Sequence, residues 1–214
     1  DLHSFPSRRS SDLYYPFSGV IMDNERRLIN NALIQDENGD YRMDFDDFER
    51  KIEEEGVKLF FLCNPHNPVG RVWTKEELLR LGEICLRHHV IVISDEIHAD
   101  FVFQGKHHVF LDVHEEFADI AIVCTSPSKT FNIAGLQLSN LFIPNRELWK
   151  KMKHAIDRSG YSQLNVMGLV AAKAAYKDGE VWYRAMHKYV WENILYVKKF
   201  VEERLPAIKM TNLQ

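Results

Sequence analysis

Short apolar runs without polar alternation divide the middle of the chain. They lie at residues 59–63, 90–93, 120–124 and 136–143, and each is followed by polar or turn-forming residues. Such runs are typical of strands that are buried on both faces of a sheet. Because helical patterns lie between them, the alternation indicates a mainly parallel sheet covered by helices. We therefore predict a three-layer α/β/α fold of the α/β class.

Helical spacing of apolar residues appears between and after these runs. Thr74 is a predicted N-cap, and Glu77 three residues later completes a capping-box pattern. Asp178-Gly179 marks a break before the last helical pattern. The three patterns nearest the end of the chain predict helices at residues 149–156, 164–176 and 182–205.

Two side-chain clusters have a functional and a structural interpretation. The acidic stretch at residues 44–55 could bind a cation, but helical spacing places Phe45, Phe48 and Ile52 on one face. We interpret it as an amphipathic helix with a solvated acidic face. An aromatic group in the last helix is interpreted as a packing surface between two domains rather than a ligand stack. Its members are Trp182, Tyr183, Tyr189, Trp191 and Tyr196.

Composition excludes several classes of protein. The chain has 214 residues, 45% of them hydrophobic, and a formal net charge of −4, which gives no electrostatic case for nucleic acid or an anionic membrane. No apolar run is long enough to span a bilayer. Cys63, Cys85 and Cys124 are isolated in apolar surroundings, as expected of reduced core residues in a cytoplasmic protein. The histidines have no partner at metal-ligand spacing, so no metal site is predicted.

Both ends of the sequence depart from a complete domain. Residues 1–13 are rich in Ser and Arg and lack periodicity, so we interpret them as a non-native, adapter-like tail or a disordered terminus. The sequence stops soon after a long helix whose apolar face has little to cover it. We therefore expect a fragment that is inactive by itself. The predicted domains are a partial large domain at 14–178 and the start of a small domain at 179–214.

Polar side chains follow three of the predicted strands, at the edge where open α/β sheets bind ligands. Asn67, Asp95 and Lys129 each come at or just after the end of a predicted strand. Ser126 and Ser128 precede Lys129 by three residues and by one. A lysine can hold pyridoxal 5′-phosphate (PLP) as a Schiff base, and a carboxylate can keep its ring nitrogen protonated. Singly, these residues could be a solvated lysine, a helix N-cap and a turn asparagine. Their order on successive strand ends indicates a PLP site.

Three segments extend this indication to a family. NPHNPVG at 64–70, SDEIHADFVF at 94–103 and SPSKTFNIAGLQ at 126–137 resemble fold-type I PLP enzymes, the aspartate aminotransferase-like class I/II superfamily. They are most similar to its cystathionine β-lyase branch, the C–S lyases of MalY/PatB type. The resemblance covers residues 14–214. It implies the large domain of a PLP-dependent transferase fold and a homodimer in the full-length protein.

The resemblance assigns roles to individual residues. It implies that Lys129 is the Schiff-base and proton-transferring residue, that Asp95 pairs with the pyridinium nitrogen and that Asn67 bonds the ring hydroxyl. Ser126 and Ser128 would approach the phosphate.

Three further positions concern the same cofactor. Tyr14 matches the aromatic residue that stacks on the ring. His98 stands where many aminotransferases have a tyrosine, and it either contacts the ring hydroxyl or its asparagine partner, or is a core histidine bonded to the backbone. Gln137 stands where many aminotransferases have an arginine that binds the phosphate, a charge-assisted contact that a neutral side chain cannot make.

These departures favour a C–S lyase. The expected reaction is α,β-elimination from an S-substituted cysteine, such as cystathionine, cysteine or an S-conjugate, to a thiol, pyruvate and ammonia. An aminotransferase is the alternative, because it shares the removal of the α-proton by Lys129. A regulatory protein that keeps the PLP fold and binds another partner is a third hypothesis.

Overall fold

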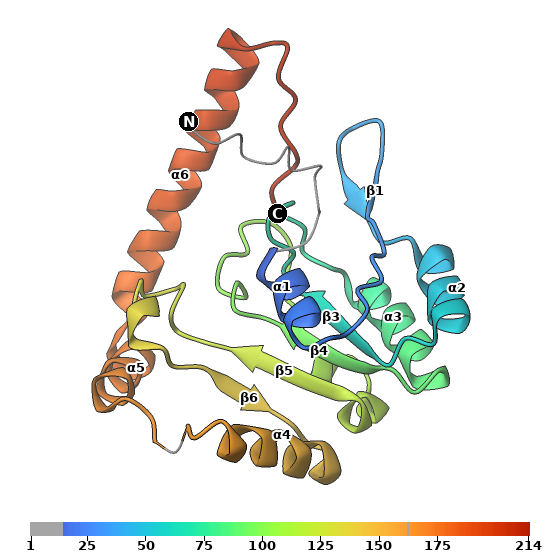
Figure 1. The fold of residues 1–214 in the computed structure, drawn as a ribbon. Helices are drawn as coiled ribbons and strands as arrows, with labels where there is room; N and C mark the ends of the chain where they lie inside the picture. Colours follow the sequence, from blue (N-terminus) through green and yellow to red (C-terminus); the bar gives the residue numbers. More distant parts are fainter. Residues whose placement is uncertain (1–14, 162) are drawn as a thin grey trace, which may run out of the picture.

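The computed structural model describes residues 15–161 and 163–214 (Figure 1). Their helices and strands run in the following order: α1 (Tyr15–Asp23), β1 (Ile34–Gln35), β2 (Tyr41–Arg42), α2 (Phe45–Glu55), β3 (Leu59–Cys63), α3 (Lys75–Arg87), β4 (Ile91–Asp95), β5 (Ala121–Thr125), β6 (Asn140–Phe142), α4 (Arg146–Arg158), α5 (Val166–Asp178) and α6 (Glu180–Arg204). Three short 3₁₀ helices lie at Phe110–Asp112, Glu115–Asp119 and Ala134–Leu136.

A four-stranded sheet in the order β3-β4-β5-β6 forms the centre of the fold. β3, β4 and β5 are parallel, whereas β6 is antiparallel to β5. The α/β class and the mainly parallel sheet are therefore confirmed. The expectation of a strand over 136–143 is wrong at its start, because Gln137 has a φ of +51°, which a strand cannot contain.

α3 packs closely beside this sheet. The Thr74–Glu77 capping box is present, with reciprocal hydrogen bonds of 3.2 Å and 2.9 Å that satisfy two free N–H groups. A Cβ atom at Gly82 would lie 1.9 Å from Cζ of Phe117, so this position has no room for a side chain. The core includes Trp73, Leu78 and Val92, all 0% exposed.

α2 has the amphipathic character expected from its sequence. Phe48 and Ile52 are buried and Phe45 packs beside them, whereas four of the acidic residues are exposed: Asp46, Glu53, Glu54 and Glu55. Asp44 caps the start of the helix by accepting from Asp47 N. The interpretation of this stretch as a solvated helix face is confirmed.

α5 and α6 meet at the predicted break, since Gly179 ends the first helix and precedes the second. α6 is a long helix at one side of the molecule (Figure 1). Its aromatic residues are only partly used for packing: Trp182 stacks on Phe131 and Trp191 on Phe103, whereas Tyr189 and Tyr196 are 65% and 70% exposed. Of the described helices, none combines the length and apolar character needed to cross a membrane.

Candidate active site

The carboxyl ends of β3, β4 and β5 meet at one edge of the sheet. Cys63, the last residue of β3, pairs with Asp95, which in turn pairs with Cys124 on β5. Just beyond this edge lies a pocket of about 90 Å³. The described residues that line it are Cys63, Pro65, Asn67, Asp95, Ile97, His98 and Lys129. Four of the predicted site residues are therefore brought together.

Asp95 is the acidic group of this pocket. Its Oδ1 accepts a hydrogen bond of 3.2 Å from the backbone N–H of Ile97. Burial raises the pKa of Asp95 above its usual value, and this bond together with the charges of His98 and Lys129 opposes the rise. A carboxylate in such a place is stabilised by a cation that enters the pocket.

His98 and Asn67 lie side by side. His98 Nε2 is 3.4 Å from Asn67 Nδ2. Burial lowers the pKa of His98, Asp95 raises it and Lys129 lowers it further. Because the amide nitrogen can only donate, the imidazole nitrogen accepts, which requires the neutral ring that burial favours.

The loop after β3 fixes the position of Asn67. His66 N–H donates to Arg71 C=O at 2.8 Å, and Gly70 N–H donates to His66 C=O at 2.9 Å. Gly70 has a φ of +74°, a backbone conformation that glycine adopts without strain. Trp73 Nε1 donates to Cys63 C=O at 2.8 Å and closes the base of the loop.

Lys129 is exposed and projects from a turn after β5. The residues on either side of it are buried. Ser128 and Ser126 are each 8% exposed, and their hydroxyl oxygens lie 2.6 Å apart. Ser126 Oγ is also 2.6 Å from Leu138 C=O, to which it can donate. Neither serine lines the pocket, so their predicted approach to a phosphate group stays a prediction.

The remaining predicted positions are Tyr14 and Gln137. Tyr14 lies outside the described residues, as do residues 1–13. Gln137 ends the 3₁₀ helix of residues 134–136 and is not among the residues that line the pocket. The prediction from sequence did not include Cys63, Pro65 and Ile97 among the site residues, although each lies at a strand end or within two residues of one.

The chemistry of these side chains fits PLP. The amine of Lys129 suits an aldehyde, the carboxylate of Asp95 suits a protonated ring nitrogen, and Asn67 and His98 offer polar atoms to a ring hydroxyl. The pocket of about 90 Å³ is smaller than the ~300–1,000 Å³ usual for ligand pockets. In their chemistry, the predicted residues and the cofactor are nevertheless compatible.

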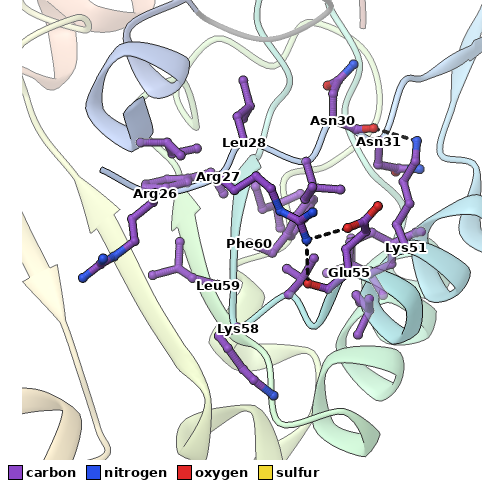
Figure 2. A pocket seen from close by; sticks show the side chains of 18 of the residues that line it. Arg26, Arg27, Leu28, Asn30, Asn31, Lys51, Glu55, Lys58, Leu59 and Phe60 are labelled. Atoms are coloured by element: carbon purple, nitrogen blue, oxygen red, sulfur yellow. Dashed lines mark hydrogen bonds and ion pairs between the residues drawn. The ribbon is translucent and has the colours of Figure 1, made fainter. Parts of the chain in front are cut away.

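A larger cavity of about 520 Å³ lies elsewhere, between residues 24–33, α2 and β3 (Figure 2). Leu28, Leu59 and Phe60 contribute to its mainly apolar lining. Arg27 donates to the backbone C=O of Glu55 at 3.1 Å and pairs with its carboxylate. Asn67, Asp95 and Lys129 are absent from the described residues that line it, so its position does not suit the predicted chemistry.

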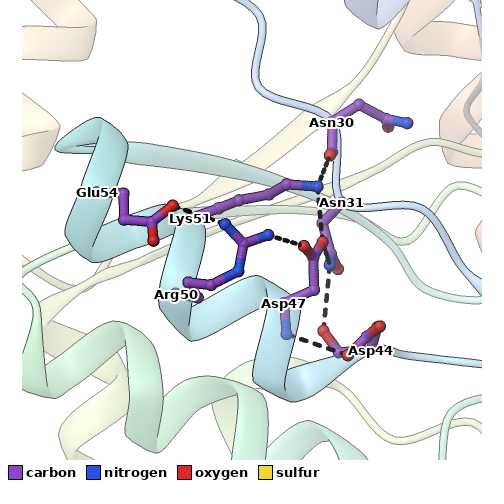
Figure 3. Close-up of polar contacts among 7 residues, drawn as sticks. All are labelled: Asn30, Asn31, Asp44, Asp47, Arg50, Lys51 and Glu54. Carbon is purple, nitrogen blue, oxygen red and sulfur yellow. Dashed lines mark hydrogen bonds and ion pairs between the residues drawn. The ribbon is translucent and has the colours of Figure 1, made fainter.

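A network of hydrogen bonds and ion pairs connects residues 30–31 to α2 beside this cavity (Figure 3). Lys51 Nζ donates to Asn30 C=O and to Asp47 Oδ2, both at 2.7 Å. Asn31 Nδ2 donates to Asp47 at 2.9 Å, and Arg50 pairs with the other oxygen of the same carboxylate. These contacts stabilise the wall of the cavity and carry no nucleophile or acid–base pair.

Comparison with known sequences identifies the class of protein that this fold and pocket define. The family model described as "Aminotransferase class I and II" matches residues 10–213, and the chain belongs to that family. Its resemblance to fold-type I PLP enzymes, and within them to C–S lyases of the PatB/MalY type, is confirmed.

Individual relatives narrow this class. Cystathionine beta-lyase PatB of Bacillus subtilis is 43% identical over 199 residues, which are 92% of this chain and 51% of the relative. Protein MalY of Escherichia coli is 32% identical over 200 residues, 91% of this chain and 50% of that protein. The chain thus spans about half the length of the curated relatives it matches.

Solved structures agree with these sequences. Cystalysin from Treponema denticola, which contains a pyridoxal 5′-phosphate cofactor, superposes with a TM-score of 0.89 at 36% identity, over 93% of this chain and 50% of its own. The PLP-bound C–S lyase from Staphylococcus hominis gives a TM-score of 0.85 at 40% identity, over 92% and 49% of the two chains.

Proposed function

We propose that this chain belongs to a PLP-dependent C–S β-lyase of cystathionine β-lyase type. Such an enzyme converts an S-substituted cysteine to a thiol, pyruvate and ammonia. The observation that carries the proposal is the meeting of Lys129, Asp95 and Asn67 at one pocket. The names of cystathionine beta-lyase PatB and the Staphylococcus hominis C–S lyase support the choice of reaction.

Asp95, Asn67, His98 and Lys129 would hold PLP, with Ser126 and Ser128 directed to its phosphate. When bound, PLP supplies an electron sink for the charge left on the substrate after its α-proton is removed. Asp95 keeps a proton on the ring nitrogen by pairing with it. Since burial raises the pKa of Asp95, a cationic partner restores its ionised form.

Lys129 is the proton carrier in this proposal. Its side chain is exposed at the end of a turn, and its four-carbon stem gives the amine reach across the pocket. The amine takes the α-proton of the substrate as a general base. It then returns a proton to the departing sulfur, and the remaining three-carbon unit is hydrolysed to pyruvate and ammonia.

His98 orients Asn67 in this scheme. Its neutral ring accepts from the Asn67 amide, which leaves the amide oxygen and the second N–H free to face the cofactor. A protonated His98 could only donate, so it would require the amide oxygen of Asn67 in place of the amide nitrogen. The pair therefore favours one rotamer of Asn67.

An aminotransferase is the second candidate, and the family match favours it. The two reactions differ in where the proton returns after Lys129 has removed it. The protein encoded by the complete gene should be incubated with cystathionine in the presence and absence of a keto acid. Pyruvate formed without the keto acid supports the lyase, whereas strict dependence on the keto acid would identify an aminotransferase.

The regulatory hypothesis has a separate test. A protein that keeps only the fold would show no absorbance band from PLP bound to a lysine.

We further propose a homodimer in the cytoplasm, with residues 14–178 in the large domain and 179–214 at the start of a smaller one. The helix break at Gly179 supports this boundary, and sedimentation of the complete protein tests the dimer.

A further inference from the structure

The loop of residues 96–110, here called the 96–110 loop, leaves β4 directly after Asp95 and returns to the core at Phe110. Three buried polar side chains near the ends of the strands that lead into the candidate site make hydrogen bonds with this loop, and one of them belongs to the loop itself. Those side chains are Glu96, Asn64 and Thr130, which are 2%, 0% and 2% exposed.

Glu96 holds the two ends of the loop together. Its Oε1 accepts from Phe110 N–H and from Ser94 Oγ, each at 2.9 Å. Its Oε2 lies 2.8 Å from His107 Nε2. A carboxylate this deeply buried is costly unless it is bonded, and here both oxygens have partners. The backbone N–H of Glu96 also donates to Cys124 C=O at 2.8 Å, which attaches the start of the loop to β5.

Asn64 connects the same loop to β3. Its Nδ2 donates to His108 C=O at 2.9 Å. Asn64 immediately follows the strand and precedes the site residue Asn67 by three positions. Its backbone N–H donates to Asp95 C=O at 3.0 Å, so the β3 end, the β4 end and the loop form one bonded unit.

Thr130 makes the third connection. Its hydroxyl donates to Asp100 Oδ2 at 2.6 Å. Thr130 is the residue next to Lys129, so this bond fixes the turn from which the lysine projects. Asp100 is held from α6 as well, because the Tyr183 hydroxyl donates to Asp100 C=O at 3.0 Å.

We propose that the 96–110 loop is the frame that aims Asn67, Asp95 and Lys129 at the cofactor, with Glu96 as its central positioning residue. This inference rests on the proposed function. Displacement of a site side chain by about 1 Å is enough to impair a bound geometry, and supporting hydrogen bonds prevent it. Glu96 does not line the pocket, so it acts through its neighbours.

The test compares Glu96→Ala with Glu96→Gln in the protein encoded by the complete gene. Two quantities are measured: the dissociation constant of PLP and the urea midpoint of the apoprotein. Loss of a buried hydrogen-bond partner predicts that Glu96→Ala binds PLP about tenfold or more weakly. Glu96→Gln stays near wild type because its oxygen still accepts from Ser94 and Phe110, and its amide can donate to His107 in the other tautomer.

Leu78→Ala is the matched control, because Leu78 is a fully buried core residue of α3 outside the pocket lining. We expect it to lower the urea midpoint and leave PLP binding unchanged. If Glu96→Ala lowers only the midpoint, as Leu78→Ala does, the positioning role is overturned. If the wild-type protein does not bind PLP at all, the proposed function is overturned together with it.

Thr130→Val decides the question should Glu96→Ala fail to fold. The substitution keeps the shape of the side chain and removes the donor to Asp100. The expected result is slower appearance of the absorbance band of lysine-bound PLP, by about tenfold on the scale of one lost hydrogen bond. A wild-type rate would contradict the inference.

Discussion

Asp95 and Lys129 line the same pocket from the carboxyl ends of two neighbouring parallel strands. The two strands pair at Asp95 and Cys124, which are both half-buried, and a polar turn follows each strand. The sheet therefore brings a carboxylate and an amine to one edge, where a cofactor with a basic ring nitrogen and an aldehyde can use both.

Lys129→Ala tests the amine. We expect the absorbance band of lysine-bound PLP to disappear and elimination to fall by about 10²–10⁴-fold or more, the range that a positioned acid–base group contributes. Lys173→Ala, at an exposed position of α5, is the control and should leave both unchanged. Full activity in Lys129→Ala would exclude this lysine from the reaction.

Asp95→Asn should have opposite effects on stability and activity. Burial raises the folded-state pKa of Asp95 above its usual value of 3.8, so the ionised carboxylate opposes folding of the apoprotein at neutral pH. The favourable contribution of the protonated form is complete below pH 3.8 and is lost as the pH rises through the folded-state pKa. The asparagine variant should therefore be the more stable apoprotein at pH 7 and gain nothing at pH 3.

The same substitution removes the partner of the ring nitrogen, so activity should fall by about 100-fold or more. Urea unfolding of the apoprotein at both pH values and the elimination assay measure the two effects. Asp112→Asn, at an exposed carboxylate, is the control for a general charge effect. A stability gain of Asp95→Asn that persists at pH 3 would show that ionisation is not its cause.

Local patterns in the sequence predicted the parts of this fold that depend on nearby residues. Thr74 and Glu77 form their capping box because both partners lie within one helical turn. The first apolar run became β3 with the predicted bounds, and the next two became β4 and β5 with shifts of one or two residues. The predicted start of the fourth strand was wrong, because Gln137 has a left-handed backbone conformation. Glutamine is not a residue type that indicates such a conformation in a sequence.

Sequence patterns did not predict the supporting contacts between residues that are distant along the chain. Glu96 was passed over because its partner Phe110 N–H lies across a loop and leaves no periodic pattern. The contact between His98 and Asn67, by contrast, was one of the alternatives that the family resemblance suggested, and the structure brings the two side chains together. Residue types and strand ends thus predict the members of a site, whereas their supporting hydrogen bonds require the structure.

The cysteines provide a test of burial beside the site. Burial raises the pKa of the Cys85 thiol to about 12, and burial together with the charges of Asp95 and Glu96 raises that of Cys124 to about 11. Because the thiolate is the reactive form, both should resist Ellman's reagent in the native protein at pH 8. Both should react after unfolding in guanidinium. Rapid labelling of Cys124 in the native Cys85→Ser variant would contradict the burial of Cys124.

Asp47 should make the free energy of unfolding of the apoprotein decrease at acidic pH. Its pKa is lowered from 3.8 to about 2, chiefly by the hydrogen bond from Lys51 and also by Asn31 and Arg50, against an opposing effect of burial. A lowered folded-state pKa stabilises the fold above pH 3.8, and this contribution is lost as the pH falls to about 2.

Asp47→Asn should therefore reduce the free energy of unfolding at pH 7 by about 1 kcal/mol, a value that allows for screening at a surface site. Near pH 2 the variant and the wild type should be equally stable, which urea titration at the two pH values measures. Asp46→Asn is the matched control one position away, since its side chain is 94% exposed and its ion pair with Arg80 is long at 3.2 Å. An equal loss in both variants at pH 7 would mean that general helix electrostatics, rather than the Lys51 network, stabilises this end of the fold.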